Sequence, residues 1–436
     1  MSARNPLDRE ILRLAVPALG ALVAEPLFLL TDTALVGHLG EVPLGGLSIA
    51  SAILQTVVGL LVFLAYATTP TVARRLGAGD LPGAVRAGID GLWLGIAIGA
   101  AVLGAGLFAG PAVVSLFRAG PDVTAAATTY LMISLWGLPA MLLVLAATGL
   151  LRGLQDTRTP LVVAGFGFLA NALLNALFIY GFGWGISGSA VGTVVAQWGM
   201  AGVYVVIAVR AARVAEVSLR PGLSGVTGAA ASGGWLLLRT ASLRLAMLAT
   251  VFVGTDLGVT ALATLQIALT IFATLAFALD ALAIAGQAMV GHGLGASDVP
   301  RVRAITRRLV WFGIVSGLAL GALLATIAPF AGPVFTSDND IHLALTVVLL
   351  VMALGVPIAG YVFVLDGVLI GAGDARYLAV SGFGNLAMYL PLLTIAASSG
   401  SVTALWASFG LGYIGARAVT LGLRARGTRW IVTGVR

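Results

Sequence analysis

The stretch Leu76–Pro82 (LGAGDLP) recurs as Leu294–Pro300 (LGASDVP), displaced by half the length of the 436-residue chain. The same displacement carries Gly137–Pro139 (GLP) onto Gly355–Pro357 (GVP). It also relates Gly149, Gly153, Asp156 and Arg158 to Gly367, Gly371, Asp374 and Arg376. A duplicated, strongly apolar half is a signature of secondary transporters, in which substrate binds in a cavity between two similar bundles. The repeat therefore predicts two related lobes.

The composition excludes a soluble protein. Hydrophobic residues make up 59% of the chain and charged residues only 9%, against roughly 25% charged residues in soluble proteins. There is no Cys, which excludes disulfides and thiolate metal sites, and the three His residues are too scattered for a metal cluster. All 24 basic residues are Arg and lie beside apolar segments, which argues against nucleic-acid binding. No cofactor is expected.

The apolar runs between polar, Gly or Pro breaks predict twelve spans, since about 20 apolar residues cross a bilayer. They lie near 11–37, 44–72, 86–110, 125–150, 160–183, 187–212, 232–255, 259–291, 306–332, 342–370, 377–398 and 401–424. The predicted fold class is an all-α polytopic membrane protein with twelve transmembrane helices in two pseudo-symmetric six-helix lobes. The N-terminal lobe is 1–212, the C-terminal lobe is 232–436, and 213–231 is a flexible cytoplasmic linker rich in Gly, Ser and Ala.

The arginines predict the orientation of the chain. They precede the first span and flank the even-numbered connections, with Arg239 among those around the central one, and those from Arg417 to Arg436 end the chain. Only Arg118 falls on the opposite side. Because positive residues favour the cytoplasmic side, both termini and the linker are expected to be cytoplasmic. We expect a multi-pass protein of the plasma membrane, which is the inner membrane in a bacterium.

Four acidic residues inside predicted spans are singled out as candidates: Glu25, Asp32, Asp280 and Asp366. A carboxylate at bilayer depth costs roughly 2.5–3.5 kcal/mol on insertion scales, so such groups usually face a wet cavity and often carry protons or ions. We predict that Asp32 does so. Glu25, Asp280 and Asp366, together with Gln287, are candidates for a substrate site or a second coupling site. The alternative for each acid is a structural role, in which its carboxyl group is neutral and forms a hydrogen bond to a neighbouring helix.

The first span combines acids with prolines. Glu25 and Asp32 are nearly two helical turns apart, so both project from one helix face about 10 Å apart along the axis. Pro17 and Pro26 each remove a backbone hydrogen bond and invite a bend. A bendable helix that bears an acid can couple protonation to shape, whereas a static kink that merely fits packing is the alternative.

Uncharged polar residues of other spans are candidates to complete a shell around Asp32. Span five carries Asn171 and Asn175 one turn apart, span four carries Tyr130 and span six carries Thr193. Singly, each such residue more often joins two helices by a hydrogen bond. Together with Asp32 they predict a cation- or proton-coupling site.

These residues and motifs resemble the multidrug and toxic compound extrusion (MATE) family, within its DinF-like branch. The resemblance spans essentially the whole chain. The matching motifs are Pro17 followed by Asp32 in DTALVG (32–37), the LGAGD-type turns, GLLRGLQDT (149–157), Asn171 with Asn175, and GISGSA (185–190).

The resemblance implies a cation-coupled exporter with two six-helix lobes that works by alternating access. Asp32 matches the first-helix acid that the family uses as its coupling site, with Tyr130, Asn171 and Thr193 as its partners. Many relatives in this branch have Asp where this chain has Asn175, and the missing charge favours protons over sodium. Asp366 stands where many members have Gln; with Asp280 it resembles the subset that includes plant organic-acid exporters.

The sequence therefore predicts a secondary antiporter that exports organic molecules, such as xenobiotic drug-like cations or metabolites, in exchange for protons or sodium. It is expected to be a monomer in the lipid bilayer with a small organic substrate, and not an enzyme. The absence of Lys excludes a P-loop. Alternatives are an organic-acid (citrate-like) exporter, a passive channel, an intramembrane enzyme, and a lipid-linked precursor flippase, which Arg239 and Arg244 keep open.

Overall fold

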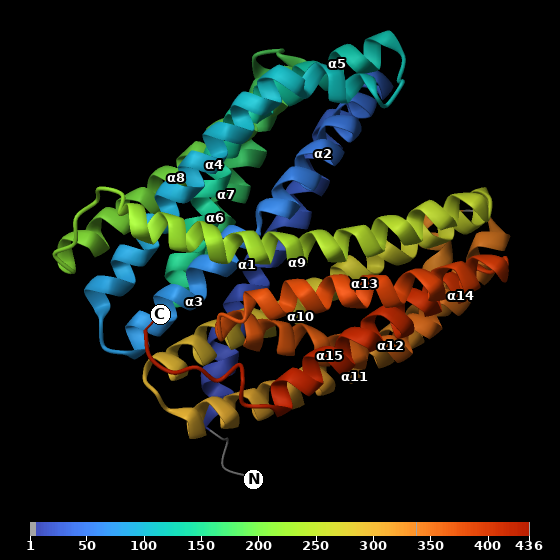
Figure 1. Cartoon of the computed structure of the whole chain (residues 1–436). Coiled ribbons are helices and arrows are strands. Elements are labelled where there is room, and N and C mark those ends of the chain that lie inside the picture. Colours follow the sequence, from blue (N-terminus) through green and yellow to red (C-terminus); the bar gives the residue numbers. More distant parts are fainter. Residues whose placement is uncertain (1–5, 337, 436) are drawn as a thin grey trace. The chain divides into compact units, whose positions relative to one another are not determined.

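The computed structural model describes residues 6–336 and 338–435, apart from the side chains of residues 25, 223 and 224. All secondary structure in these residues is helical, with no strand (Figure 1). The α-helices are α1 (Pro6–Gly37), α2 (Glu41–Leu61), α3 (Phe63–Gly77), α4 (Leu81–Ser115), α5 (Pro121–Ser134), α6 (Leu138–Gly153), α7 (Arg158–Ala176), α8 (Gly185–Val214), α9 (Leu223–Asp256), α10 (Val259–Gly295), α11 (Val299–Phe335), α12 (Asn339–Gly371), α13 (Ala375–Ser398), α14 (Val402–Ala407) and α15 (Ile414–Arg426). Short 3₁₀ or π segments are η1 (Leu135–Gly137), η2 (Leu177–Gly181) and η3 (Ser408–Tyr413).

Eleven helical stretches of the described chain are long and apolar enough to cross a membrane. The twelfth predicted span, 401–424, is also helical, but the π-helical segment η3 divides it into α14 and α15. Neither piece alone reaches the length of a membrane span, although the run from Val402 to Arg426 is continuous. The prediction of an all-α chain with twelve spans is confirmed.

The helices group into two compact units. Gly20–Gly233 forms one, here called the N-terminal unit, and the described residues before and after it form the other, the C-terminal unit. The two boundaries fall within α1, between Leu19 and Gly20, and within α9, between Gly233 and Gly234.

The connection between α8 and α9, residues 215–222, is bound to α4. Arg86 donates to the Ser218 carbonyl oxygen at 2.7 Å, and the Trp93 indole donates to the Leu219 carbonyl oxygen at 2.8 Å. The Gly222 amide in turn donates to the Asp90 carboxylate at 2.8 Å. The segment predicted as a linker thus contains a connection held to α4 by hydrogen bonds, followed by the first residues of α9.

The repeated LGAGDLP and LGASDVP motifs form the same turn. Asp80 accepts a hydrogen bond from the Gly83 amide at 2.8 Å and caps α4, and Asp298 accepts one from the Arg301 amide at 3.0 Å and caps α11. Each cap satisfies an amide at the helix start that has no partner within the helix. The residue before each cap has a positive φ: 79° at Gly79 and 56° at Ser297.

The repeated glycines near the ends of spans four and ten allow equivalent helix contacts. A Cβ at Gly149 of α6 would lie 2.9 Å from the carbonyl oxygen of Ala65 on α3. A Cβ at Gly367 of α12 would lie closer still to the carbonyl oxygen of Ala283 on α10. Ala65 and Ala283 are themselves related by the displacement of the repeat. Glycine therefore lets the helix backbones touch in both units, which is typical of membrane bundles.

Candidate functional site

Asp32 lies inside the N-terminal unit and accepts hydrogen bonds from three helices. Its side chain belongs to α1, and the residue is only 3% exposed. The Tyr130 hydroxyl of α5 donates to Oδ2 at 2.9 Å, and the Asn175 amide of α7 donates to Oδ1 at 3.0 Å. The Ser189 hydroxyl of α8 also donates to Oδ1. Asp32 therefore joins four helices through one carboxyl group.

A second layer of polar groups supports the donors. Asn171 donates to the Thr193 hydroxyl at 3.0 Å, and the amides of Asn171 and Asn175 lie 3.4 Å from each other in both directions. Asn171 and Asn175 are one turn apart on α7, so their side chains lie on the same helix face. The structure thus brings together Asp32, Tyr130, Asn171, Asn175 and Thr193, the five residues predicted as the coupling site.

Ser189 was not predicted as part of this cluster. It is completely buried and belongs to the GISGSA motif, which the sequence analysis used only as a family resemblance. The available signal was its spacing, because Ser189 precedes Thr193 by one helical turn on α8.

The Asp32 cluster is made of one carboxyl group and neutral partners. Hydroxyl and amide groups can hydrogen bond to an ionised carboxylate or to a protonated carboxyl, because a hydroxyl both donates and accepts. The cluster can therefore gain or lose a proton without breaking an ion pair. Within the described residues there is no group of three or more His, Cys, Asp or Glu side chains that could hold a metal ion.

The prolines of α1 lie within an unbroken helix. The backbone is helical from Pro6 to Gly37, through both Pro17 and Pro26. Their part in helix bending stays a prediction. The side chain of Glu25 lies outside the described residues.

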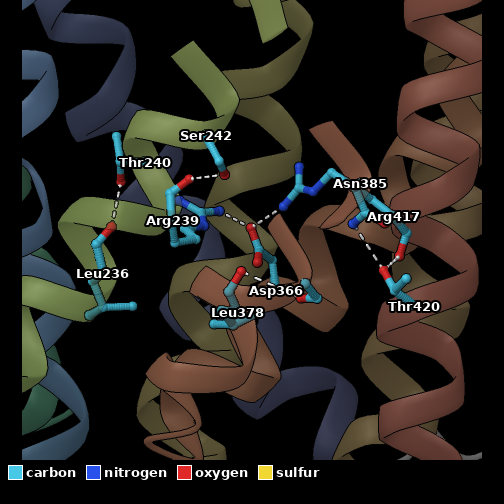
Figure 2. Close-up of polar contacts among 10 residues, drawn as sticks. Leu236, Arg239, Thr240, Ser242, Asp366, Leu378, Asn385, Arg417 and Thr420 are labelled. Carbon is cyan, nitrogen blue, oxygen red and sulfur yellow. Dashed lines mark hydrogen bonds and ion pairs between the residues drawn. The ribbon is translucent and has the colours of Figure 1, made fainter. Parts of the chain in front are cut away.

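Asp366 lies in the C-terminal unit and pairs with two arginines. It belongs to α12 and is 4% exposed. Arg417 of α15 donates to Asp366 Oδ2 at 2.8 Å, and Arg239 of α9 forms an ion pair with the same oxygen. Figure 2 shows both guanidinium groups directed at this carboxylate from different helices.

The other two candidates, Asp280 and Gln287, lie on α10. Neither lines the pocket beside Asp366. Asp280 is half-buried. Gln287 is 1% exposed, and its amide nitrogen and oxygen have no hydrogen-bond partner among the described residues. The pocket beside Asp366 therefore does not include these two candidates.

Two arginines are placed differently from the sequence interpretation. Arg417 was counted with the cytoplasmic C-terminal arginines and Arg239 with those around the linker. Both lie within helices, where Arg417 is 6% exposed and the Arg239 side chain 13% exposed. The physical reason is Asp366, since a buried cation needs a carboxylate partner. Such a pairing between distant segments has no local sequence signal.

Comparisons with known proteins agree with this architecture. The MatE family model matches residues 17–177 and 239–393, so the chain belongs to this family. Protein DETOXIFICATION 43 of Arabidopsis thaliana is 28% identical, covering 96% of this chain and 90% of its own length. DNA damage-inducible protein F of Escherichia coli (strain K12) is 26% identical over 92% of each chain. The solved Vibrio cholerae MATE transporter VcmN in the bent form has a TM-score of 0.88 at 21% identity, covering 98% of this chain and 99% of that one.

Proposed function

We propose that this member of the MatE family is a secondary antiporter that exports small organic molecules in exchange for protons, with Asp32 as the coupling group. Export is supported by the family and by relatives such as the probable multidrug resistance protein NorM of Pseudomonas putida, which is 30% identical over 76% of this chain. Membership of a transporter family argues against an enzyme, and we expect no cofactor other than the coupling ion.

The observation that carries the choice of protons is the set of partners around Asp32. Three donors, Tyr130, Asn175 and Ser189, already point hydrogen atoms at its two oxygens. A sodium ion needs several oxygen ligands directed inward, and at least the Asn175 amide would have to turn around to supply one. A proton needs only one carboxylate oxygen and the rotation of a neighbouring hydroxyl.

The proposed cycle uses the charge of Asp32 as its switch. The ionised carboxylate belongs to the outward-facing, substrate-loaded state, because a buried charge is tolerated only where polar partners or a substrate offset its desolvation. A proton from outside neutralises Asp32, the hydrogen-bond pattern changes, and α1 rearranges around Pro17 and Pro26. The substrate is displaced, and release of the proton to the cytoplasm resets the cluster.

The surroundings of this cycle are part of the proposal. The protein would be a monomer in the plasma membrane, the inner membrane of a bacterium, with both termini in the cytoplasm and no nucleic-acid partner. Its lobes would be 1–212 and 232–436, joined by the segment 213–231. The NorM relatives suggest drug-like substrates.

Purified protein in proteoliposomes tests the proposal. A pH gradient and a sodium gradient are imposed separately, and export is measured over a panel of cationic and anionic organic compounds. The expected result is export driven by the pH gradient alone and lost in Asp32→Asn. Export driven equally by sodium without a pH gradient, or unchanged export by Asp32→Asn, would overturn the proton assignment.

A further inference from the structure

α15 makes two arginine–aspartate contacts, a part-buried one by Arg424 and a buried one by Arg417, and they differ in how completely they are paired. Arg424 and Asp374 form a bidentate ion pair. Nε donates to Oδ2 at 2.6 Å, and Nη2 donates to Oδ1 at 3.1 Å. This fork-to-fork geometry satisfies both partners. At Asp366, by contrast, Arg417 and Arg239 meet on the single oxygen Oδ2, while the buried Oδ1 has no hydrogen bond from the part of the chain that the structure describes. The second contact is therefore an incomplete pairing.

A small pocket lies beside this incomplete pairing. It is lined by Arg239, Ser242, Leu243, Asp366, Leu378, Ser381, Gly382, Asn385, Arg417 and Leu421, all in the C-terminal unit. The charged groups in this lining are two guanidinium groups and one carboxylate. Asn385 is 1% exposed and donates to the Thr420 hydroxyl at 3.1 Å, but its amide oxygen accepts no hydrogen bond within residues 6–336 and 338–435. The pocket thus holds polar groups whose hydrogen-bonding capacity is not used.

We propose that Arg239 and Arg417 form a binding subsite for the carboxylate group of an organic anion, and that Asp366 occupies this subsite when no such ligand is bound. The proposal deepens the proposed function, on which it rests, by naming a substrate class. Asp366 then acts as an internal counter-ion: an incoming carboxylate takes over the guanidinium groups, and Asp366 moves aside within the pocket.

The chemistry of the lining favours a carboxylate over other ligands. Each guanidinium has five N–H donors in a planar fork that matches a carboxylate, and Arg417 spends one hydrogen bond on Asp366. Because Asp366 stays within the pocket, an incoming carboxylate brings the lining from two guanidinium groups and one carboxylate to two of each, so neither arginine is left as an unpaired buried cation. A phosphate dianion would bring more negative charge beside Asp366, and a cationic compound would meet two positive groups.

Titration of purified protein in lipid nanodiscs tests the subsite without any gradient. The probes are 2-naphthoate, its uncharged amide 2-naphthamide, and inorganic phosphate. We expect naphthoate to bind at least about tenfold more tightly than the amide, and phosphate to bind weakly. Arg417→Gln should lose most of this preference. Arg424→Gln, which removes a fully paired arginine from the same helix, is the matched control and should keep it.

Asp366→Asn separates a ligand subsite from a structural ion pair. The amide keeps the size of the side chain but no longer competes for the arginines, so naphthoate should bind about tenfold more tightly than in the wild type. A purely structural pair predicts a lower unfolding temperature and no gain in affinity, and that outcome would overturn the proposal. Arg417→Lys is the substitute if Arg417→Gln does not fold. Lysine keeps the positive charge but lacks the planar guanidinium group, so naphthoate binding should weaken several-fold.

The two proposals fail separately. Equal binding of naphthoate and naphthamide in a protein that still shows proton-driven export would overturn the anion subsite alone. Arginine-dependent naphthoate binding in a protein without gradient-driven export would overturn the proposed function alone.

Discussion

The two repeats use the same helix positions for different chemistry. The displacement of the repeat relates Asp32 and Asn171 of the N-terminal unit to Thr250 and Tyr389. These two hydroxyl groups hydrogen bond to each other at 2.6 Å, and Tyr389 packs on the ring of Tyr413. Where the N-terminal unit holds a carboxyl group among amides and hydroxyls, the C-terminal unit has a neutral, aromatic-rich core.

The reverse holds for the charged cluster of the C-terminal unit. Asp366 corresponds to Thr148, which donates a weak hydrogen bond to Tyr204 at 3.4 Å, and the positions of Arg239 and Arg417 correspond to Ala21 and Gly199. Each unit therefore has a carboxyl cluster that the other lacks. Duplication preserved the backbone, while the chemistry was divided between a carboxyl group with neutral partners and one with cationic partners.

The largest effect on export is expected at Asp32, and little effect is expected at Thr250, the residue that the repeat relates to it. Asp32→Asn should lower proton-driven export by about 100-fold or more, because the amide keeps the size of the side chain but cannot bind or release a proton. The matched control, Thr250→Val, removes the polar group at the equivalent position and should retain export. Transport assays in proteoliposomes measure both. A comparable loss in Thr250→Val would remove the functional difference between the repeats.

The next effect tests whether the helix contacts of the two repeats are equally tight. Gly367→Ala and Gly149→Ala should each lower stability by about 1–3 kcal/mol, because the added methyl group meets a carbonyl oxygen. Gly367→Ala should be the more damaging, since its Cβ would lie closer to the facing oxygen than a Cβ at Gly149 would. Thermal unfolding in detergent provides the measurement. Gly384→Ala, where the added methyl group would meet open space, is the control and should be neutral.

A smaller effect concerns ion choice at the Asp32 cluster. Asn175→Asp adds a second carboxylate next to Asp32 and supplies the negative charge that a sodium site requires. We expect export to become several-fold more dependent on sodium. Transport under a sodium gradient at constant pH measures this change, and an unaltered ion preference would show that Asn175 does not select the proton.

The smallest effect compares the repeated turns. Ser297→Gly should stabilise the C-terminal unit by up to about 1 kcal/mol, because glycine tolerates the positive φ that serine adopts there at a cost. Gly79→Ser should destabilise the N-terminal turn by a similar amount. The measurement is the change in unfolding temperature relative to the wild type. An increase for Ser297→Gly and a decrease for Gly79→Ser would support the equivalence of the turns, and changes of the same sign would contradict it.

Local and periodic features of the structure could be predicted from the sequence, whereas pairings between distant segments could not. The LGAGD-type turns follow from capping and glycine conformation, and the spans follow from hydropathy. Because polar residues are rare in apolar helices, the sequence also indicated four partners of Asp32: Tyr130, Asn171, Asn175 and Thr193. The pairing of Arg239 and Arg417 with Asp366 joins helices that are far apart in the chain, and nothing near either arginine indicates its partner. The π-helical break at Ser408–Tyr413 likewise has no hydropathy signal.

The central claim is that Asp32 reversibly binds a proton inside the N-terminal unit. Infrared difference spectroscopy of the purified protein in lipid, recorded between alkaline and acidic pH, measures this directly. The account predicts a band of a protonated carboxyl group that appears on acidification and is absent from Asp32→Asn. An identical difference spectrum for the wild type and Asp32→Asn would show that Asp32 does not exchange a proton and would contradict the account.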